Sequence, residues 1–200
     1  MTDWDERYGR GEHVIKEPMP LLVSTVNELR PGRALDLACG PGRHAIFLAE
    51  RGWRVTAVDA SKVGIELAKT LAQLRGVEVD WRVADLERGE FEIEPEAYDL
   101  VCVFYYLQRD LFPQIRAGVR PDGLAVAAIH MTDDDPEVKE MNPAYLLGPG
   151  ELHAEFSGWE ILHDYEGAST EEGHRRRTAE IVARKRQAAG SRQKRQTCLY

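Results

Sequence analysis

Residues 34–61, ALDLACGPGRHAIFLAERGWRVTAVDAS, constrain the fold more than any other part of the chain. An apolar strand leads into a turn that contains Gly40 and Gly42, a helix follows, and a second strand ends at Asp59. This order indicates a nucleotide-cofactor site, because glycines let the backbone approach a ligand at the start of a helix. The spacing Gly40-x-Gly42-x-x-Ala45 also fits the dinucleotide fingerprint, so the segment alone does not name the cofactor.

The same alternation of strand and helix continues through residues 33–131. It predicts an α/β fold, a doubly wound and mostly parallel sheet of seven strands with helices on both faces. Two later strands without a helix between them predict an antiparallel hairpin at the C-terminal edge. The expected strands are 33–38, 53–60, 77–85, 98–106, 124–130, 159–167 and 175–186, and the expected helices begin near 20, 43, 62, 110 and 149.

We expect a single domain over residues 1–186. Residues 1–30 are predicted to form an N-terminal lid, irregular up to residue 19, followed by a helix that starts at Pro20. Residues 33–131 would hold the cofactor, and residues 132–186 would complete the sheet. The polar, aperiodic segment 187–200 is predicted to be a disordered tail.

Composition bounds the partners. A hydrophobic content of 43% and a charged content of 30% are those of a globular protein, and no apolar run is long enough to span a membrane. The three cysteines show no CxxC spacing, and residues 1–13 lack the apolar core of a secretory signal, so we expect a cytoplasmic protein without disulfide or metal site. The net charge of −8 argues against DNA, and the basic residues of 175–195 favour a solvated strand and tail over RNA binding.

Charge decides between the possible cofactors. Asp36 lies four residues before Gly40, where a dinucleotide would place its pyrophosphate, and like charges ~4 Å apart cost about 4 kcal/mol at an effective dielectric of about 20. S-adenosylmethionine has an ammonium and a sulfonium and no phosphate, so a carboxylate at this strand end suits it. The N–H groups of the glycine turn are expected to take its carboxylate.

Two further carboxylates at strand ends suit a nucleoside. Asp59 is expected to accept both ribose hydroxyls, and Asp85 to accept from the adenine amino group, with the Leu86 N–H facing the ring. The other predicted cofactor contacts are Tyr8, Ala38, Cys39, Gly40, Gly42, Ala60 and Phe104.

These motifs identify a family resemblance. Over residues 33–131 the chain resembles the class I S-adenosylmethionine-dependent methyltransferases, with LDLACGPG, VTAVDAS, VADLE and YDLVCVFYYLQRD as their first four motifs, and with Ala38 where the family often has glycine. WDERY near the N-terminus and the C-terminal hairpin are similar to small bacterial methyltransferases of the tellurite-resistance type. That resemblance implies that His174 and Arg175 help to hold an oxyanion.

The acceptor of the methyl group is less constrained. Transfer from a sulfonium mainly needs alignment of the acceptor, and Tyr106 and His130 are candidate acceptor-side groups at strand ends. The sequence does not show which of Tyr105 and Tyr106 faces the pocket, and the missing Pro-Pro after the fourth strand disfavours nucleobases. We predict a methyltransferase for a small molecule, a soft nucleophile or oxyanion. The alternatives are a dinucleotide-dependent oxidoreductase and a non-catalytic cofactor- or RNA-binding protein.

Overall fold

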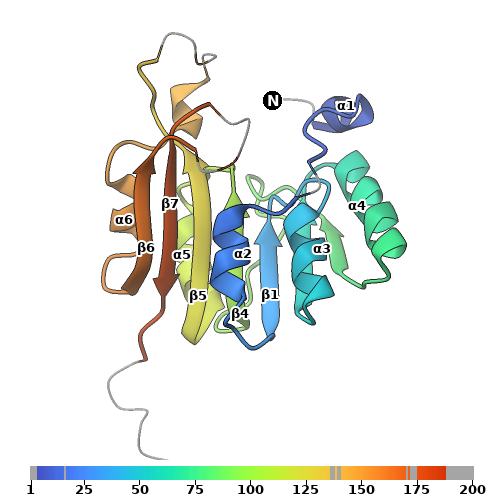
Figure 1. Cartoon of the computed structure of the whole chain (residues 1–200), viewed down its shortest axis with the longest axis horizontal. Helices are drawn as coiled ribbons and strands as arrows, with labels where there is room; N and C mark the ends of the chain where they lie inside the picture. Colours follow the sequence, from blue (N-terminus) through green and yellow to red (C-terminus); the bar gives the residue numbers. More distant parts are fainter. Residues whose placement is uncertain are drawn as a thin grey trace, which may run out of the picture.

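A computed structural model describes residues 4–15, 17–135, 138, 141–169, 171 and 175–187. Within these residues seven strands form one sheet in the order β3-β2-β1-β4-β5-β7-β6 (Figure 1). The strands are β1 Arg33–Leu37, β2 Arg54–Asp59, β3 Asp80–Val83, β4 Tyr98–Phe104, β5 Val119–His130, β6 Glu160–Gly167 and β7 Thr178–Arg184. The helices are α1 Trp4–Gly9, α2 Pro20–Val26, α3 Arg43–Glu50, α4 Lys62–Arg75, α5 Leu111–Gly118 and α6 Glu151–Glu155, with a 3-10 turn at Pro143–Tyr145.

Strand direction confirms the predicted fold class. β3, β2, β1, β4 and β5 pair in parallel, whereas β7 pairs antiparallel to β5 and to β6. The strand order reverses between β1 and β4, so their carboxyl ends are the place where a sheet of this kind binds ligands. Because β7 runs against β5, its first residue, Thr178, pairs with His130, the last residue of β5.

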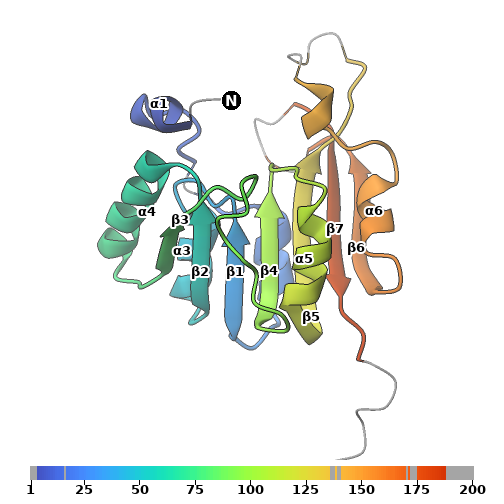
Figure 2. The ribbon, with the colours of Figure 1, turned by 180° about the vertical axis from the view of Figure 1, so that it is seen from behind.

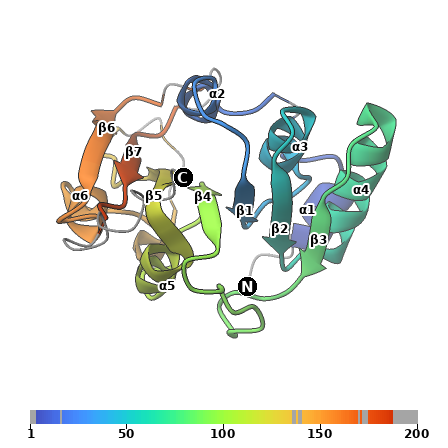
Figure 3. The ribbon, with the colours of Figure 1, turned by 90° about the horizontal axis from the view of Figure 1, so that it is seen from below.

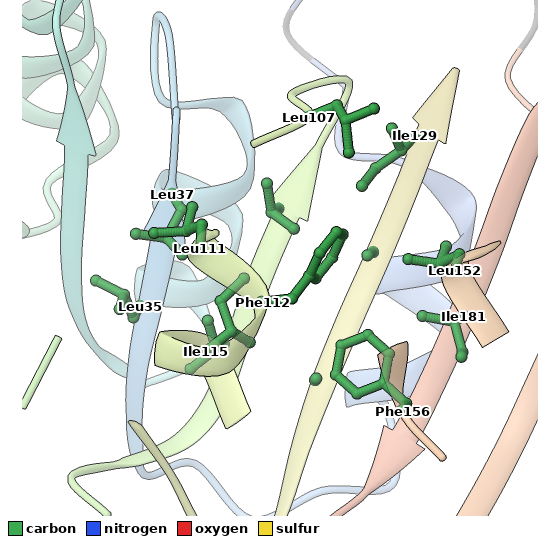
Figure 4. Close-up of a cluster of buried hydrophobic side chains, with 14 of the residues drawn as sticks. Leu35, Leu37, Leu107, Leu111, Phe112, Ile115, Ile129, Leu152, Phe156 and Ile181 are labelled. Atoms are coloured by element: carbon green, nitrogen blue, oxygen red, sulfur yellow. The ribbon is translucent and has the colours of Figure 1, made fainter. Parts of the chain in front are cut away.

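The sheet separates two apolar cores. Helices α2 and α3 cover one face, and α5 and α6 cover the other (Figures 1 to 3). β1 serves both layers, because Leu35 and Leu37 point to one face and Ala34 to the other. Figure 4 shows the α5 layer, where Phe112 meets the Phe156 ring at a centroid distance of 6.1 Å. The alternation along β1 places Asp36 on the α3 face.

Two local predictions differ from the structure. Residues 4–9 are helical rather than irregular, because α1 is stabilised by packing on α4 and not by an apolar repeat of its own. The fifth strand was expected over residues 124–130, but β5 already starts at Val119, which pairs with Tyr98, and it includes Pro121–Gly123. The β4–β5 pairing shifts register between Tyr98 and Leu100, and Asp122 has φ 66°, so the strand continues through Pro121–Gly123 as an irregularity.

In the described part of the chain, no helix is both long enough and apolar enough to cross a membrane.

Candidate active site

The turn between β1 and α3 needs its glycines for space as well as for conformation. Gly40 and Gly42 have φ values of 53° and 81°. A Cβ on Gly42 would lie 2.5 Å from the Trp81 ring and 2.9 Å from the Ala68 Cβ, and a Cβ on Gly40 would lie 2.6 Å from the Tyr8 hydroxyl. The turn is therefore enclosed by α4, by β3 and by the N-terminal helix α1.

Two predicted contacts in this turn, Ala38 and Cys39, have distinct surroundings. Ala38 adopts φ 53°, a left-handed conformation that favours glycine, which explains why glycine is frequent at this position in the family that the sequence resembles. Cys39 is buried, and burial raises the pKa of its thiol well above the ordinary value. The thiol is thus a neutral packing group.

The backbone donors of the turn are already used inside the protein. The Cys39 N–H donates to the Val58 carbonyl at 3.0 Å, the Gly40 N–H to Asp59 Oδ2 at 2.7 Å, and the Gly42 N–H to the Cys39 carbonyl at 3.0 Å. These three bonds hold the turn in shape. The binding of the cofactor carboxylate by N–H groups of this turn stays a prediction.

Asp59 links the ends of β1 and β2. Its second oxygen, Oδ1, accepts from the Ser61 N–H at 2.8 Å, beside the exposed Ala60. Asp59 is only 8% exposed, and burial raises the pKa of its carboxyl, although the hydrogen bonds from Ser61 and Gly40 oppose this shift. Each oxygen retains a lone pair for a ligand hydroxyl.

Asp36 is buried to a degree that the sequence argument did not anticipate. It is 1% exposed; Oδ1 lies 3.5 Å from the Cys102 thiol, and Oδ2 has no well-formed hydrogen bond from a described residue. Burial raises the pKa of the Asp36 carboxyl to about 7, although the Cys102 thiol and the Ala45 N–H oppose this shift. The expectation of a fully ionised Asp36 is therefore too strong for the ligand-free protein at neutral pH, and a cation near Oδ2 would favour the ionised form.

The N-terminal helix α1 lies over the glycine turn. Asp5 Oδ1 accepts from Ser61 Oγ at 2.5 Å and from the Val63 N–H at 3.1 Å, which fixes α1 to the start of α4. This contact places Tyr8 against Gly40 and Gly64. Burial raises the pKa of the Tyr8 hydroxyl, so the group is a neutral donor. His13 is exposed, with its ring 5.7 Å from that of Trp4.

The two adjacent tyrosines after β4 point in different directions. The Tyr106 hydroxyl donates to Gln108 Oε1 at 2.7 Å, and Gln108 Nε2 donates to the Leu86 carbonyl at 3.2 Å, so Tyr106 lies beside the segment that contains Asp85. Asp85 is paired with Arg88 at 3.3 Å. Tyr105 instead lies on the α3 face, where its ring centroid is 4.7 Å from that of His130.

Around Tyr105 the structure assembles residues that sequence reasoning missed. The Tyr105 hydroxyl donates to Glu171 Oε2 at 2.6 Å, and Arg43 Nη2 donates to the same oxygen at 3.2 Å. Thr178, the register partner of His130, is fully buried, and its hydroxyl has no hydrogen-bond partner among the described residues. The one sequence signal for Arg43 is its position directly after the glycine turn; nothing local indicates Glu171.

The remaining predicted residues lie apart from this cluster. Phe104 is buried with its ring 4.1 Å from that of His44, and it packs beneath α3. Arg175 is exposed, and His174 lies outside the described residues. Among the residues that the structure describes, no three His, Cys, Asp or Glu side chains are grouped as metal ligands.

Comparisons with known proteins point to methyltransferases. Residues 34–123 match the methyltransferase domain family. The probable S-adenosyl-L-methionine-dependent methyltransferase TehB of Haemophilus influenzae is 26% identical over 150 residues, which cover 70% of this chain and 50% of that protein. The crystal structure of TehB from Haemophilus influenzae aligns with a TM-score of 0.73 and 20% identity over 91% of this chain and 67% of that chain. These similarities support a class I S-adenosylmethionine-dependent methyltransferase.

Another methyltransferase is similarly related. The ubiquinone biosynthesis O-methyltransferase of Rickettsia felis is 27% identical over 164 residues, covering 78% of this chain and 60% of that protein. The chain thus spans 60% of the length of that relative and 50% of TehB. S-adenosylmethionine is the cofactor of this methyltransferase class, which confirms the predicted cofactor, and these relatives give no support to the oxidoreductase or RNA-binding alternatives.

Proposed function

We propose that the protein transfers the methyl group of S-adenosylmethionine to a small molecule, a soft nucleophile or oxyanion, in the cytoplasm. The observation that carries this proposal is the Asp36 carboxyl, which is buried on the α3 face and whose Oδ2 has no well-formed hydrogen bond from a described residue. A buried carboxylate oxygen with so little hydrogen bonding is costly, and a ligand ammonium supplies both the charge and the hydrogen bond. A pyrophosphate supplies neither.

Each residue at the strand ends would bind a different part of the cofactor. Asp59 would accept from the ribose through the lone pairs that Gly40 and Ser61 leave available, and Asp85 with Leu86 would hold the adenine. Tyr8 would cover the methionine end from α1. When bound, the cofactor supplies an electrophilic methyl group on a positively charged sulfur.

On the acceptor side the chain mainly orients the substrate and excludes water. Tyr105 and His130 lie at the carboxyl ends of β4 and β5, and Tyr106 lies on the adenine side of the same strand end. Burial raises the pKa values of both tyrosines, so each acts as a neutral hydrogen-bond donor rather than as a base at neutral pH. His130 is then the group that could accept a proton from an acceptor that needs deprotonation.

Two measurements test this function. Isothermal titration should show binding of S-adenosylmethionine and S-adenosylhomocysteine but not of NAD; binding of NAD alone would overturn the proposal. A radiolabelled methyl-transfer screen over thiols, chalcogen oxyanions, phenols and carboxylates should then identify the acceptor class. Phenols belong in the screen because of the O-methyltransferase relative. Methylation of RNA but of no small molecule would contradict the proposed substrate class.

A further inference from the structure

A largely buried ion pair lies at the end of β4 on the α3 face. Arg43 contributes two guanidinium nitrogens to the Glu171 carboxylate, Nη1 to Oε1 and Nη2 to Oε2, the latter at 3.2 Å. The two side chains are only 12% and 10% exposed. Tyr105 donates to the same carboxylate at 2.6 Å. One carboxylate therefore receives a forked cation and a neutral donor from two other segments.

The two donors of this cluster, Arg43 and Tyr105, lie at the ends of regular elements, whereas the Glu171 carboxylate comes from the segment that connects two strands. Arg43 is the first residue of α3, and its Nη1 also donates to the Glu17 carbonyl at 3.2 Å. Tyr105 follows β4 directly and has φ 58°, a strained conformation for a tyrosine that the surrounding structure must maintain. Glu171 lies between β6 and β7, outside any strand or helix.

The cluster lies at the carboxyl ends of β4 and β5, where the proposed function places the methyl acceptor. The Tyr105 ring lies 4.7 Å from that of His130, and His130 pairs in register with Thr178, which brings the buried Thr178 hydroxyl to the same face. A guanidinium fork and a phenol hydroxyl match the geometry of a carboxylate or a similar oxyanion. A hydroxyl that has no described partner adds a donor beside them.

We propose that Arg43 and Tyr105 bind the anionic group of the methyl acceptor, and that Glu171 occupies their place until the acceptor displaces it. This inference rests on the proposed methyltransferase function and specifies its substrate as a compound that carries a carboxylate or comparable oxyanion. It assigns the anion-binding role to Arg43, not to the exposed Arg175.

Benzoate is a suitable probe, with neutral benzamide as its counterpart. We would titrate each compound into the full chain, with and without saturating S-adenosylhomocysteine, and follow binding by NMR chemical-shift perturbation. Glu171→Ala should bind benzoate at least ten times more tightly than the unmodified protein, because the internal competitor is gone. Adding Arg43→Lys or Tyr105→Phe to Glu171→Ala should reduce that affinity at least threefold, and benzamide should not respond.

A matched control is available elsewhere on the surface. Glu151 accepts from Arg109 Nε at 2.5 Å and from Nη2 at 3.1 Å, also in a forked ion pair, but at the start of α6, on the face of the sheet opposite to Tyr105. Glu151→Ala should leave benzoate affinity unchanged. Equal affinities in the Glu171→Ala and unmodified proteins, or an equal gain in Glu151→Ala, would overturn the proposal.

Cofactor binding separates this inference from the proposed function. Failure of the unmodified protein to bind S-adenosylhomocysteine would contradict the function, while the benzoate titrations without nucleoside would still test the anion site. Arg43→Lys should not lower the affinity of the protein for S-adenosylhomocysteine. If it does, and 5′-methylthioadenosine, which lacks the amino acid end, is unaffected, then Arg43 binds the cofactor carboxylate and the acceptor assignment is wrong. Glu171→Gln, which retains the side-chain shape, provides a second variant should Glu171→Ala fold poorly.

Discussion

The Asp59 carboxylate accepts a 2.7 Å hydrogen bond from the backbone N–H of Gly40, nineteen residues earlier in the chain. This bond joins the turn after β1 to the end of β2, two segments that also pair as neighbouring strands. The residue predicted to recognise the ribose is therefore also a structural part of the glycine turn.

Replacing Asp59 should affect both stability and binding. Asp59→Ala leaves the Gly40 and Ser61 N–H groups without their acceptor, which we expect to lower the free energy of unfolding by about 2–4 kcal/mol. Urea unfolding measures this loss, and calorimetry should show at least a tenfold weaker affinity for S-adenosylhomocysteine. Asp80→Ala, at an exposed site paired with Arg82, is the control and should change neither quantity much. An unchanged nucleoside affinity in Asp59→Ala would remove the residue from the cofactor site.

The raised pKa of Asp36 makes stability depend on pH with a defined sign. Its carboxyl has a pKa of about 7 in the folded protein against 3.8 as the ordinary value, so between these values the native state binds more protons than the unfolded state. The stability contribution of this group is therefore lost as the pH rises toward 7. We expect Asp36→Asn to gain roughly 2–3 kcal/mol relative to the unmodified protein between pH 5 and pH 8, by urea unfolding. A constant difference across this range contradicts the assignment.

Burial of His44 acts in the opposite direction, because it lowers the pKa of that imidazole and costs stability as the pH falls below about 6.5. The unmodified protein and Asp36→Asn both contain His44, so its contribution to the pH dependence of stability cancels when the two are compared.

Cofactor binding should follow the same titration. Because a ligand cation favours the ionised Asp36, S-adenosylhomocysteine affinity should rise by up to about tenfold per pH unit as the pH increases toward 7, and then level off. Calorimetry from pH 5.5 to 8.5 measures this dependence. In Asp36→Asn the affinity should be lower and nearly independent of pH. The same pH profile in both proteins would show that Asp36 is not the linked group.

The space around Gly42 gives a packing prediction. In Gly42→Ala the new Cβ would lie 2.5 Å from the Trp81 ring and 2.9 Å from Ala68, and the residue would keep φ 81°. Crowding and the left-handed conformation together should cost about 2–5 kcal/mol. Gly76→Ala is a close control, since Gly76 has φ 67° but no atom within 4 Å of its Cβ position, and it should cost only about 1–2 kcal/mol. Thermal unfolding of the two variants separates crowding from backbone strain; equal losses would show that crowding is unimportant.

The attachment of α1 depends on one carboxylate. Asp5→Ala removes the contacts to Ser61 Oγ and to the Val63 N–H, so we expect faster hydrogen exchange in residues 4–9 and a loss of about 0.5–1.5 kcal/mol. Ser61 still accepts from the Gly64 N–H, so the start of α4 should remain protected. Glu6→Ala, which removes an exposed pair with Arg10, should leave exchange at Tyr8 nearly unchanged. Unaltered exchange in Asp5→Ala would mean that Tyr8 alone holds α1.

Local patterns account for what the sequence predicted. Apolar strands bounded by glycine turns depend on neighbouring residues, and for that reason the parallel core, the glycine turn and the late hairpin were all predictable. The helix α1 was not, because its stability comes from contacts with α4, far along the chain. The conformation of Ala38 likewise depends on the turn and not on its own preference.

The polar contacts of the site were harder to predict for the same reason. Arg43 and Glu171 are separated by 128 positions, and Cys102 and Asp36 by 66, so no spacing rule joins them. From the sequence Asp36 was expected to be ionised, whereas the fold buries it and raises its pKa. Burial by distant segments decides how strongly a carboxylate is charged, and a linear sequence does not display it.

The C-terminal hairpin has a consequence for how such enzymes diversify. β6 ends at Gly167 and β7 begins at Thr178, beside the last residue of β5, so the connection between them reaches the carboxyl end of the sheet, where Glu171 meets Arg43. Asp59 and Asp85 come from other strand ends. Under the proposed function, exchanging this connection between homologous proteins should therefore change which acceptors are methylated while the predicted nucleoside contacts are retained.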